Sequence, residues 1–237
     1  MKPPKIIRGL LVVTIGGLLV SGYFQGRVRR FLCRVNVNGS TKIAFLPHTG
    51  RLQDILVRGA RVTLRKVPHR TKVEYDILAV YQGDTPIIVD SRLPNVIVAE
   101  AIAEGRLPEF AGYRSIKKEV RVGTSRLDFM LEDEKPCYLE VKGCTLAINS
   151  IALYPDAPTL RGAEHLRLLT ALRKRQQRAA VFFLAMRPDV RSFKVNEELD
   201  PEFARELSRA KSAGVEVYAY SSVFEGDTAR IGHRLSC

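Results

Sequence analysis

The sequence lacks the ligand spacing of a zinc site. Its 237 residues include four cysteines and four histidines, and no two cysteines have C-x-x-C spacing. Zinc sites need closely spaced Cys and His side chains, so the sequence argues against zinc-dependent classes. Scattered cysteines in a chain of this size are typical of free thiols in a reducing cytoplasm, although a Cys137–Cys144 bridge stays open. We therefore expect a cytoplasmic protein.

The chain also lacks a clear membrane span. An apolar run covers residues 9–24, but it is shorter than the roughly 20 residues that a spanning helix needs, and it contains four glycines. No A-x-A-like cleavage site follows it, which argues against secretion. Three interpretations stay open for this run. It is a membrane anchor that contacts the bilayer through residues 6–24, an apolar hairpin turning at Gly16-Gly17 and packing on the body, or a leader from an upstream start codon.

Acidic residues are scarce in the first third of the chain. Through residue 80 there are fifteen Lys/Arg and three Asp/Glu, so this part holds +12 of the net charge of +13. A strongly basic segment is a candidate for binding a polyanion, with nucleic acid as the first choice and an anionic membrane surface as the competitor. The remainder is nearly neutral, as expected of a catalytic domain that carries carboxylates. No protein partner is indicated.

After residue 26, short alternating segments separated by turn residues predict strands. We place them at residues 28–37, 41–46, 61–67, 73–82 and 86–90, with a hairpin turn at Asn38-Gly39. Five short, basic strands indicate a small barrel of the OB type, whose basic face commonly holds nucleic acid. The arginines of this part that we expect to contact nucleic acid are Arg27, Arg29, Arg30, Arg51, Arg61 and Arg65.

From residue 91 onward the pattern alternates between helices and strands. The predicted elements are a helix at 95–104, a strand at 115–120, a hairpin over 125–142, a strand at 148–154, a helix at 160–176, a strand at 179–186, a helix at 200–213 and a strand at 215–220. Thr159 and Asp200 are the predicted N-caps of the two later helices, and the tail from Phe224 has no strong pattern. We therefore predict an α/β (α+β) protein with an apolar extension at 1–22, an OB-like barrel at 23–90 and a second domain at 91–237.

The hairpin over residues 125–142 carries the candidate chemistry. If its two strands pair, Asp128, Glu140 and Lys142 share one face. Two carboxylates can hold a hard cation such as Mg²⁺ through oxygen ligands, and the cation and the lysine can then offset charge at a scissile phosphate. The other interpretation is a solvated strand face with a weak cross-strand ion pair. The pattern of aspartate, spacer and Glu-x-Lys resembles the PD-(D/E)xK nucleases.

Five separated strings together resemble the sugar fermentation stimulation protein family. They are L-P-H-T-G-R-L at 46–52, L-P-N-V-I-V-A-E-A at 93–101, R-L-D-F-M-L at 126–131, Y-L-E-V-K-G-C-T-L at 138–146 and Y-P-D-A-P-T-L-R-G-A-E-H-L at 154–166. The resemblance covers about residues 23–220. It implies an OB-type domain followed by a PD-(D/E)xK nuclease-like domain, with DNA as the partner and Mg²⁺ or Mn²⁺ as the cofactor.

The resemblance also implies roles for single residues. Asp128, Glu140 and Lys142 match the nuclease signature, with Asp128 and Glu140 as metal ligands. The other catalytic candidates are Glu100, which matches an acidic position on the first helix, and His165 of the R-G-x-x-H-L string, whose Arg161 is a candidate phosphate contact. Each has a structural alternative, because Glu100 suits a solvated helix face and His165 suits a structural hydrogen bond. His48 stands where the family usually has asparagine.

The sequence therefore leaves two functional classes open. The first is a cytoplasmic DNA-binding protein with a Mg²⁺-dependent nuclease site. The second is a non-catalytic DNA-binding regulator, linked to sugar metabolism through the family, whose nuclease fold is degenerate. A third interpretation is a membrane-tethered protein whose arginines contact lipid headgroups. Metal-dependent cleavage of DNA separates the first two classes.

Overall fold

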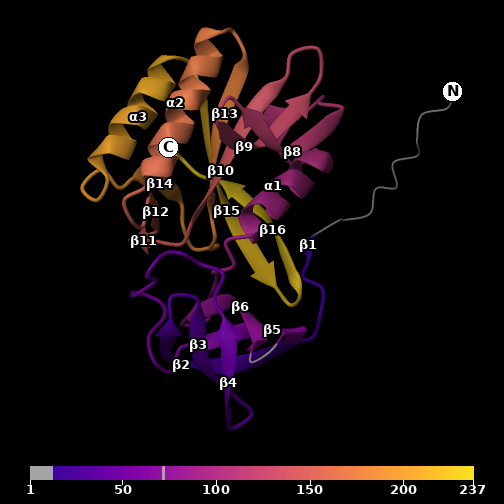
Figure 1. Ribbon diagram of the computed structural model, residues 1–237, viewed down its shortest axis with the longest axis vertical. Coiled ribbons are helices and arrows are strands. Elements are labelled where there is room, and N and C mark those ends of the chain that lie inside the picture. The colour runs from indigo at the N-terminus through magenta and orange to yellow at the C-terminus, as the bar shows by residue number, and fades with distance from the viewer. Residues whose placement is uncertain (1–12, 71–72) are drawn as a thin grey trace, which may run out of the picture.

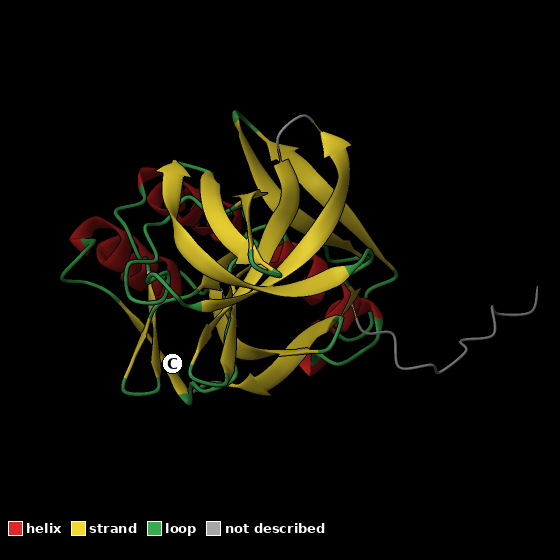
Figure 2. Ribbon diagram, turned by 90° about the horizontal axis from the view of Figure 1, so that it is seen from below, coloured by secondary structure: helices red, strands yellow, loops and turns green. Residues whose placement is uncertain are grey.

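A computed structural model of the protein describes residues 13–70 and 73–237. The chain forms two bodies that stack along the long axis (Figure 1). One is a barrel of strands, and Figure 2 views the molecule from this end. The other is a sheet body with helices on both faces. This arrangement confirms the predicted fold class, an α/β protein with an OB-like barrel followed by a sheet body.

The barrel is built from the first third of the chain. Its strands run in the order β4-β3-β2-β5-β6-β7, and a parallel pairing of β4 with β6 closes it. The predicted strand 28–37 was wrong in one respect, because the chain turns at Arg30-Phe31 and the two sides belong to different strands. The barrel strands are β2 Leu19–Arg29, β3 Leu32–Val37, β4 Ser40–Phe45, β5 Arg61–Arg70, β6 Val73–Gln82 and β7 Thr85–Ile88.

The second body is organised around a sheet of order β1-β16-β15-β13-β10-β9-β8. The strand predicted from the continuous apolar run lies at the centre of this sheet. Its residues 179–185 are buried, as expected for a strand in a sheet that is covered on both faces. The strands are β1 Val13–Thr14, β8 Ser115–Val122, β9 Ser125–Glu132, β10 Cys137–Cys144, β13 Arg178–Ala185, β15 Glu216–Glu225 and β16 Thr228–Arg234. A small separate sheet contains β11 Ala147–Ile148, β12 Ile151–Tyr154 and β14 Ser192–Val195.

Helices cover the two faces of the large sheet. They are α1 Leu93–Ala103, the short 3-10 helix Pro108–Phe110, α2 Leu160–Lys174 and α3 Pro201–Ser212. The apolar side chains of α1 join one core, and those of α2 and α3 join the core on the opposite face. Both predicted N-caps are confirmed, since Thr159 Oγ1 accepts from Gly162 N at 3.1 Å and Asp200 Oδ1 accepts from Phe203 N at 2.9 Å.

The described part of the apolar N-terminal run is built into both bodies. Val13 and Ile15 are 6% and 3% exposed within the α1-side core, where β1 pairs with β16. The chain then enters β2, so the predicted boundary after residue 22 falls inside a barrel strand. Of the hairpin interpretation, packing on the body is borne out for the described residues, whereas the described strands β1 and β2 pair with other strands and not with each other. The part of the predicted membrane contact at 6–12 lies outside the described residues.

One further difference concerns the tail of the chain. The tail from Phe224 was expected to lack a pattern, yet it completes β15 and forms β16, because alternating Ala229 and Ile231 face the core. The Cys137–Cys144 bridge is excluded, since all four cysteines are free. Among the described residues, no helix has both the length and the apolar character required to cross a bilayer.

Candidate active site

The candidate site lies where β9 and β10 separate. The two strands pair from Cys137↔Leu131 to Leu139↔Phe129, and the ladder ends there. Beyond this point main-chain N–H groups of the two strands donate to side-chain carboxylates of the neighbouring strand. Val141 N donates to Asp128 Oδ2 at 2.8 Å, and Asp128 N donates to Glu140 Oε2 at 3.4 Å. Each carboxylate is therefore held in the opening by the main chain of the neighbouring strand, and the predicted shared face is present.

The first turn of α1 reaches the same carboxylate from the other side. Asn95 Nδ2 donates to Asp128 Oδ1 at 2.8 Å. Both carboxylate oxygens of Asp128 are consequently oriented, one by a helix and one by a strand. Asn95 was predicted to lie at the start of a helix, without a functional role. Its position two residues into the L-P-N string was the only available signal.

Glu140 is the most enclosed member of the site, with 2% of its surface exposed. Lys142 Nζ forms an ion pair with Glu140 Oε1 at 2.6 Å. His165 of α2 contacts the same oxygen through Nδ1, and its Nε2 lies 3.4 Å from Arg161 Nε. These partners assign the ring proton to Nδ1, which donates to the carboxylate, and leave Nε2 as the acceptor for the guanidinium. Residues 161 and 165 share a helix face because they are four positions apart.

The environment moves the pKa values of the two carboxyl groups in opposite directions. Burial, and then the charge of Glu140, raise the pKa of Asp128 above its ordinary value. Burial alone would also raise the pKa of Glu140, but the hydrogen bond from His165 and the charge of Lys142 together hold it below its ordinary value. Like-charge repulsion between paired carboxylates is relieved by a proton or by a cation. The site is therefore suited to taking up positive charge beside Asp128.

The donor set fits a hard, hydrated cation. Within residues 13–70 and 73–237, no three His, Cys, Asp or Glu side chains converge as a metal cage. Mg²⁺ is commonly bound through one or two carboxylates, with water and substrate phosphate completing its octahedron. Asp128 and Glu140 provide those two carboxylates. They fit an ion of this class better than an ion that needs an all-protein cage.

The structure does not bring Glu100 into this cluster. Its charged neighbours are Glu104, Arg106 and Lys118, and burial followed by the charge of Glu104 raises its pKa. Its Oε2 atom is buried and lacks a hydrogen-bond partner among the described residues. The structure thus places Asn95, and not Glu100, at the end of α1 that contacts Asp128. The expectation of a catalytic acid at position 100 was based on the family pattern alone.

The seven predicted nucleic-acid arginines occupy different environments. Arg65 forms an ion pair with Asp76 at 2.6 Å, and Arg61 pairs with Asp84 at 3.2 Å while lying over the ring of Tyr81. These two guanidiniums are therefore already engaged within the barrel. Arg29 and Arg51 are exposed, and the remaining three, Arg27, Arg30 and Arg161, are described next.

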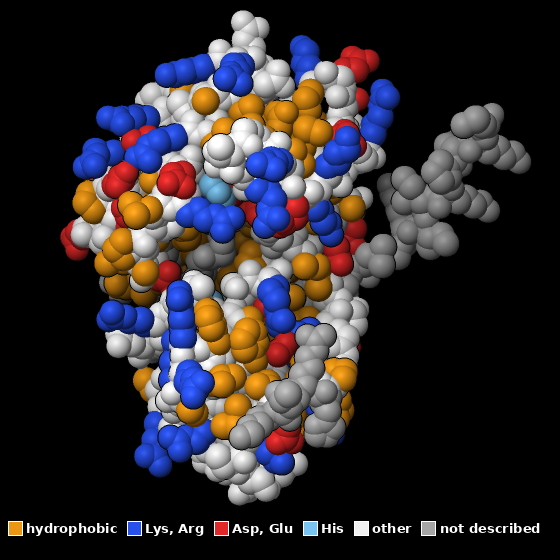
Figure 3. Space-filling view, in the orientation of Figure 1, with side chains coloured by type: hydrophobic (Ala, Val, Ile, Leu, Met, Phe, Trp, Pro, Cys, Tyr) orange, Lys and Arg blue, Asp and Glu red, His pale blue; other side chains and the backbone are white. Residues whose placement is uncertain are grey.

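Arg27 and Arg30 lie at the junction of the two bodies, whereas Arg161 lines a separate hollow of the sheet body with Arg121, Arg126 and His165. Arg27 Nη2 donates to Gly50 O at 2.8 Å and to Arg51 O at 2.9 Å, so it holds the loop that follows β4. Arg30 lines the cavity between the bodies. In Figure 3, Lys and Arg side chains stand on both sides of a hollow between the bodies. The basic residues thus border this hollow as well as the barrel surface.

The fold and the site together define a class: a protein with a closed barrel joined to a sheet body, in which two carboxylates, a lysine and a histidine meet where two strands separate. Comparison with known families is more specific. Residues 92–228 match the family described as "Sugar fermentation stimulation protein RE domain", and residues 26–89 match "SfsA N-terminal OB domain". The chain belongs to the sugar fermentation stimulation protein (SfsA) family, which confirms the resemblance drawn from its five strings.

Individual relatives agree with this assignment. The sugar fermentation stimulation protein homolog of Moorella thermoacetica is 43% identical over 213 residues, which is 88% of this chain and 92% of the relative. That of Caldanaerobacter subterraneus subsp. tengcongensis is 40% identical over 205 residues, 86% and 90% of the two chains. Among solved structures, Pyrococcus furiosus SfsA in complex with Ca²⁺ has a TM-score of 0.88 at 30% identity. This match covers 95% of this chain and 98% of the other.

Proposed function

We propose that this protein binds DNA and cleaves its phosphodiester backbone with the help of a divalent cation. The observation that carries the proposal is the convergence of Asp128, Glu140 and Lys142 at the point where β9 and β10 separate. Two carboxylates and one ammonium group in such a place meet the needs of phosphodiester hydrolysis. The related SfsA in complex with Ca²⁺ supports a divalent cation as the cofactor, with Mg²⁺ or Mn²⁺ as the catalytic choice.

Each residue of the site has a distinct task in this proposal. Asp128 and Glu140 would hold the cation, which when bound neutralises charge at the phosphate and lowers the pKa of a water ligand. Lys142 directs its ammonium group toward developing negative charge on the phosphate. Asn95 orients Asp128, and His165 keeps Glu140 ionised through its hydrogen bond. His165 is therefore a positioning residue, because its ring contacts the carboxylate and Arg161.

DNA binding is supported by charge and by the position of the basic residues. The first 80 residues hold +12 of the net charge of +13, and OB-type barrels commonly bind nucleic acid on a basic surface. Arg30 borders the hollow between the bodies, and Arg161 contacts His165 of the candidate site. A phosphate backbone that follows these residues would pass the candidate site. We accordingly assign binding to the barrel together with the rim of the sheet body.

A non-catalytic DNA-binding regulator is the second candidate. It is favoured by the engagement of Glu140 Oε1, which both Lys142 and His165 already contact. A carboxylate neutralised in this way can be a structural ion pair, because buried charges need partners. In that case the acidic cluster would stabilise the fold and would not recruit a cation.

Titration of Mn²⁺ into the protein separates the two candidates. We expect the wild type to bind one ion and to cleave DNA, and Asp128→Asn to lose both activities while it keeps its DNA affinity. Asp133→Asn is the matched control, since Asp133 lies in the turn after the same strand and pairs with Arg114 at 3.3 Å. Equal Mn²⁺ binding by wild type and Asp128→Asn, or no binding by either at millimolar metal, would exclude the metal site.

A further inference from the structure

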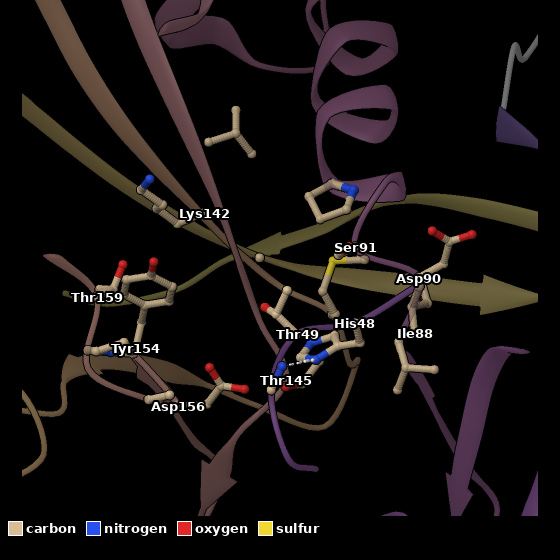
Figure 4. A pocket seen from close by; sticks show the side chains of 18 of the residues that line it. His48, Thr49, Ile88, Asp90, Ser91, Lys142, Thr145, Tyr154, Asp156 and Thr159 are labelled. Atoms are coloured by element: carbon tan, nitrogen blue, oxygen red, sulfur yellow. Dashed lines mark hydrogen bonds between the residues drawn. The ribbon is translucent and has the colours of Figure 1, made fainter. Parts of the chain in front are cut away.

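A cavity lies between the two bodies, directly beside the candidate active site (Figure 4). Its volume is about 370 Å³. Three consecutive residues of β10, Val141, Lys142 and Gly143, form part of its wall. Lys142 also pairs with Glu140. The cavity is therefore adjacent to the carboxylates that are proposed to bind the metal. A group bound in this cavity would be a neighbour of the phosphate at the site.

The dimensions of the cavity restrict what it can hold. A volume of about 370 Å³ is near the lower end of the roughly 300–1,000 Å³ that is usual for small-molecule pockets. A DNA duplex, whose major groove alone is about 12 Å wide, cannot enter. A single base that has left the stack can enter, and proteins that act on DNA commonly place such a base in a closely fitting pocket.

The walls offer both apolar and polar contacts, as a nucleobase requires. Pro94, Ile88 and Met186 contribute apolar surface, and the ring of Tyr154 lies on the side of Lys142. Flat apolar surfaces suit the faces of a base. The edges of a base need hydrogen-bond donors and acceptors, and two side chains provide them.

These two side chains are His48 and Asp156, which come from segments more than 100 residues apart. Both surround Gly50, where an added Cβ would overlap Asp156 Oδ2 and lie 2.8 Å from His48 Cε1. Gly50 N donates to His48 Nδ1 at 2.9 Å, which leaves Nε2 to carry the proton and act as a donor. Burial, partly offset by the charge of Asp156, lowers the pKa of His48, so the ring stays neutral at pH 7. These two side chains therefore contribute one donor and one acceptor to the cavity.

Basic residues mark a route for the DNA strand past the site. Arg30 lines the cavity on the barrel side. A second hollow on the far side of His165 is lined by Arg121, Arg126 and Arg161. The candidate carboxylates and Lys142 lie between these two basic regions. A single strand can thus contact arginines on both sides while one of its bases enters the cavity.

We propose that the cavity between the bodies binds an unpaired nucleobase next to the phosphate at Lys142, so that the substrate is single-stranded or locally unpaired DNA. This inference rests on the proposed function, because it places the base relative to that site. It predicts that an oligonucleotide with an unpaired base binds more tightly than a fully paired duplex of the same length and sequence context.

Binding in EDTA with 2-aminopurine oligonucleotides tests the proposal without any cleavage. The fluorescence of this base rises when it leaves the stack, and we expect a rise when the wild type binds a duplex with one unpaired 2-aminopurine. Ala157→Trp fills the cavity from an exposed position in its wall. Since base stacking contributes about 1–3 kcal/mol, this variant should bind the unpaired-base duplex about tenfold more weakly or worse. Its affinity for the paired duplex should stay within about twofold.

Ala111→Trp is the matched control, because Ala111 is also exposed but does not line this cavity. It should bind both duplexes like the wild type. Equal weakening of both duplexes by Ala157→Trp, or no weakening of either, would overturn the proposal, as would a wild type that prefers the paired duplex. Selective binding without Mn²⁺-dependent cleavage would instead retain the base pocket and reject the nuclease function, so the two failures are distinguishable.

Discussion

The backbone N–H of Asp128 donates to the side chain of Glu140, at 3.4 Å from its Oε2 atom. This bond, with its counterpart from Val141 N to Asp128 Oδ2, replaces the ladder that ends at Leu139↔Phe129. The candidate metal ligands therefore also satisfy main-chain groups of separating strands. These bonds fix the positions of the two carboxylates, as the proposed metal site requires.

His165 controls the charge of Glu140, and its replacement should be detectable through pH. The pKa of Glu140 lies below its ordinary value of 4.5, so this group stabilises the fold above pH 4.5 and loses that effect as the pH falls further. His165→Ala removes a buried partner and should lower the free energy of unfolding at pH 7 by about 1–3 kcal/mol. Urea unfolding should show a smaller difference from wild type at pH 3.5.

His165→Gln provides the control for this prediction. An amide at position 165 can donate to Glu140, so it should recover part of the loss at pH 7. A deficit of His165→Ala that is the same at pH 7 and pH 3.5 would contradict the assigned role. It would show that His165 stabilises the fold by packing alone.

Asn95 and Glu100 lie on the same helix, and we expect opposite outcomes from their substitution. Asn95→Ala should weaken Mn²⁺ binding, because Asp128 loses the donor at 2.8 Å that orients it. Glu100→Gln should leave Mn²⁺ binding unchanged. It should also raise stability at pH 7, since a raised pKa means that the folded state disfavours the ionised form and grows relatively more stable as pH falls.

Calorimetric titration and urea unfolding check both variants. Loss of Mn²⁺ binding in Glu100→Gln would return Glu100 to the site and contradict the placement described above. A wild-type metal affinity in Asn95→Ala would show that Val141 N alone is sufficient to orient Asp128.

The candidate site was largely predictable because its residues lie on elements with clear periodicity. Asp128 and Glu140 alternate with buried apolar residues, and two-residue alternation fixes the face of a strand. Their contact with Asn95 and the meeting of His48 with Asp156 were not predictable. Those contacts depend on how α1 and the loop after β4 pack on other elements, and local pattern contains no information about packing between distant segments.

The N-terminal run shows a second limit of local pattern. An apolar stretch of sixteen residues is ambiguous between a membrane and a protein core. The described part of this stretch belongs to the protein core, because β1 pairs with β16 at the edge of the large sheet. Since the tail had no recognisable pattern of its own, neither partner of this pairing could be recognised from the sequence.

The burial of Ile15 predicts that this region stabilises the fold. Ile15→Ala should lower the free energy of unfolding by about 2–5 kcal/mol, the usual cost of such a truncation in a core. Leu18→Ala is the matched control, because Leu18 is 63% exposed whereas Ile15 is 3% exposed. Urea unfolding measures both. Near-neutral effects of both substitutions would show that this segment does not contribute to the cooperative core.

Arg161 and Arg61 allow a test of which basic residues contact DNA. Arg161 lies beside His165 of the candidate site, whereas Arg61 is engaged by Asp84 and by the ring of Tyr81. Each neutralised phosphate contributes about −0.9 to the slope of log affinity against log salt on duplex DNA, and less on single strands. Arg161→Gln should therefore weaken binding and make the slope shallower by about one phosphate, while Arg61→Gln should change neither.

Both variants lose one positive charge, so a general charge effect would appear equally in both. Fluorescence anisotropy at several salt concentrations measures the slopes, and equal losses in the two variants would mean that the DNA does not run past the candidate site.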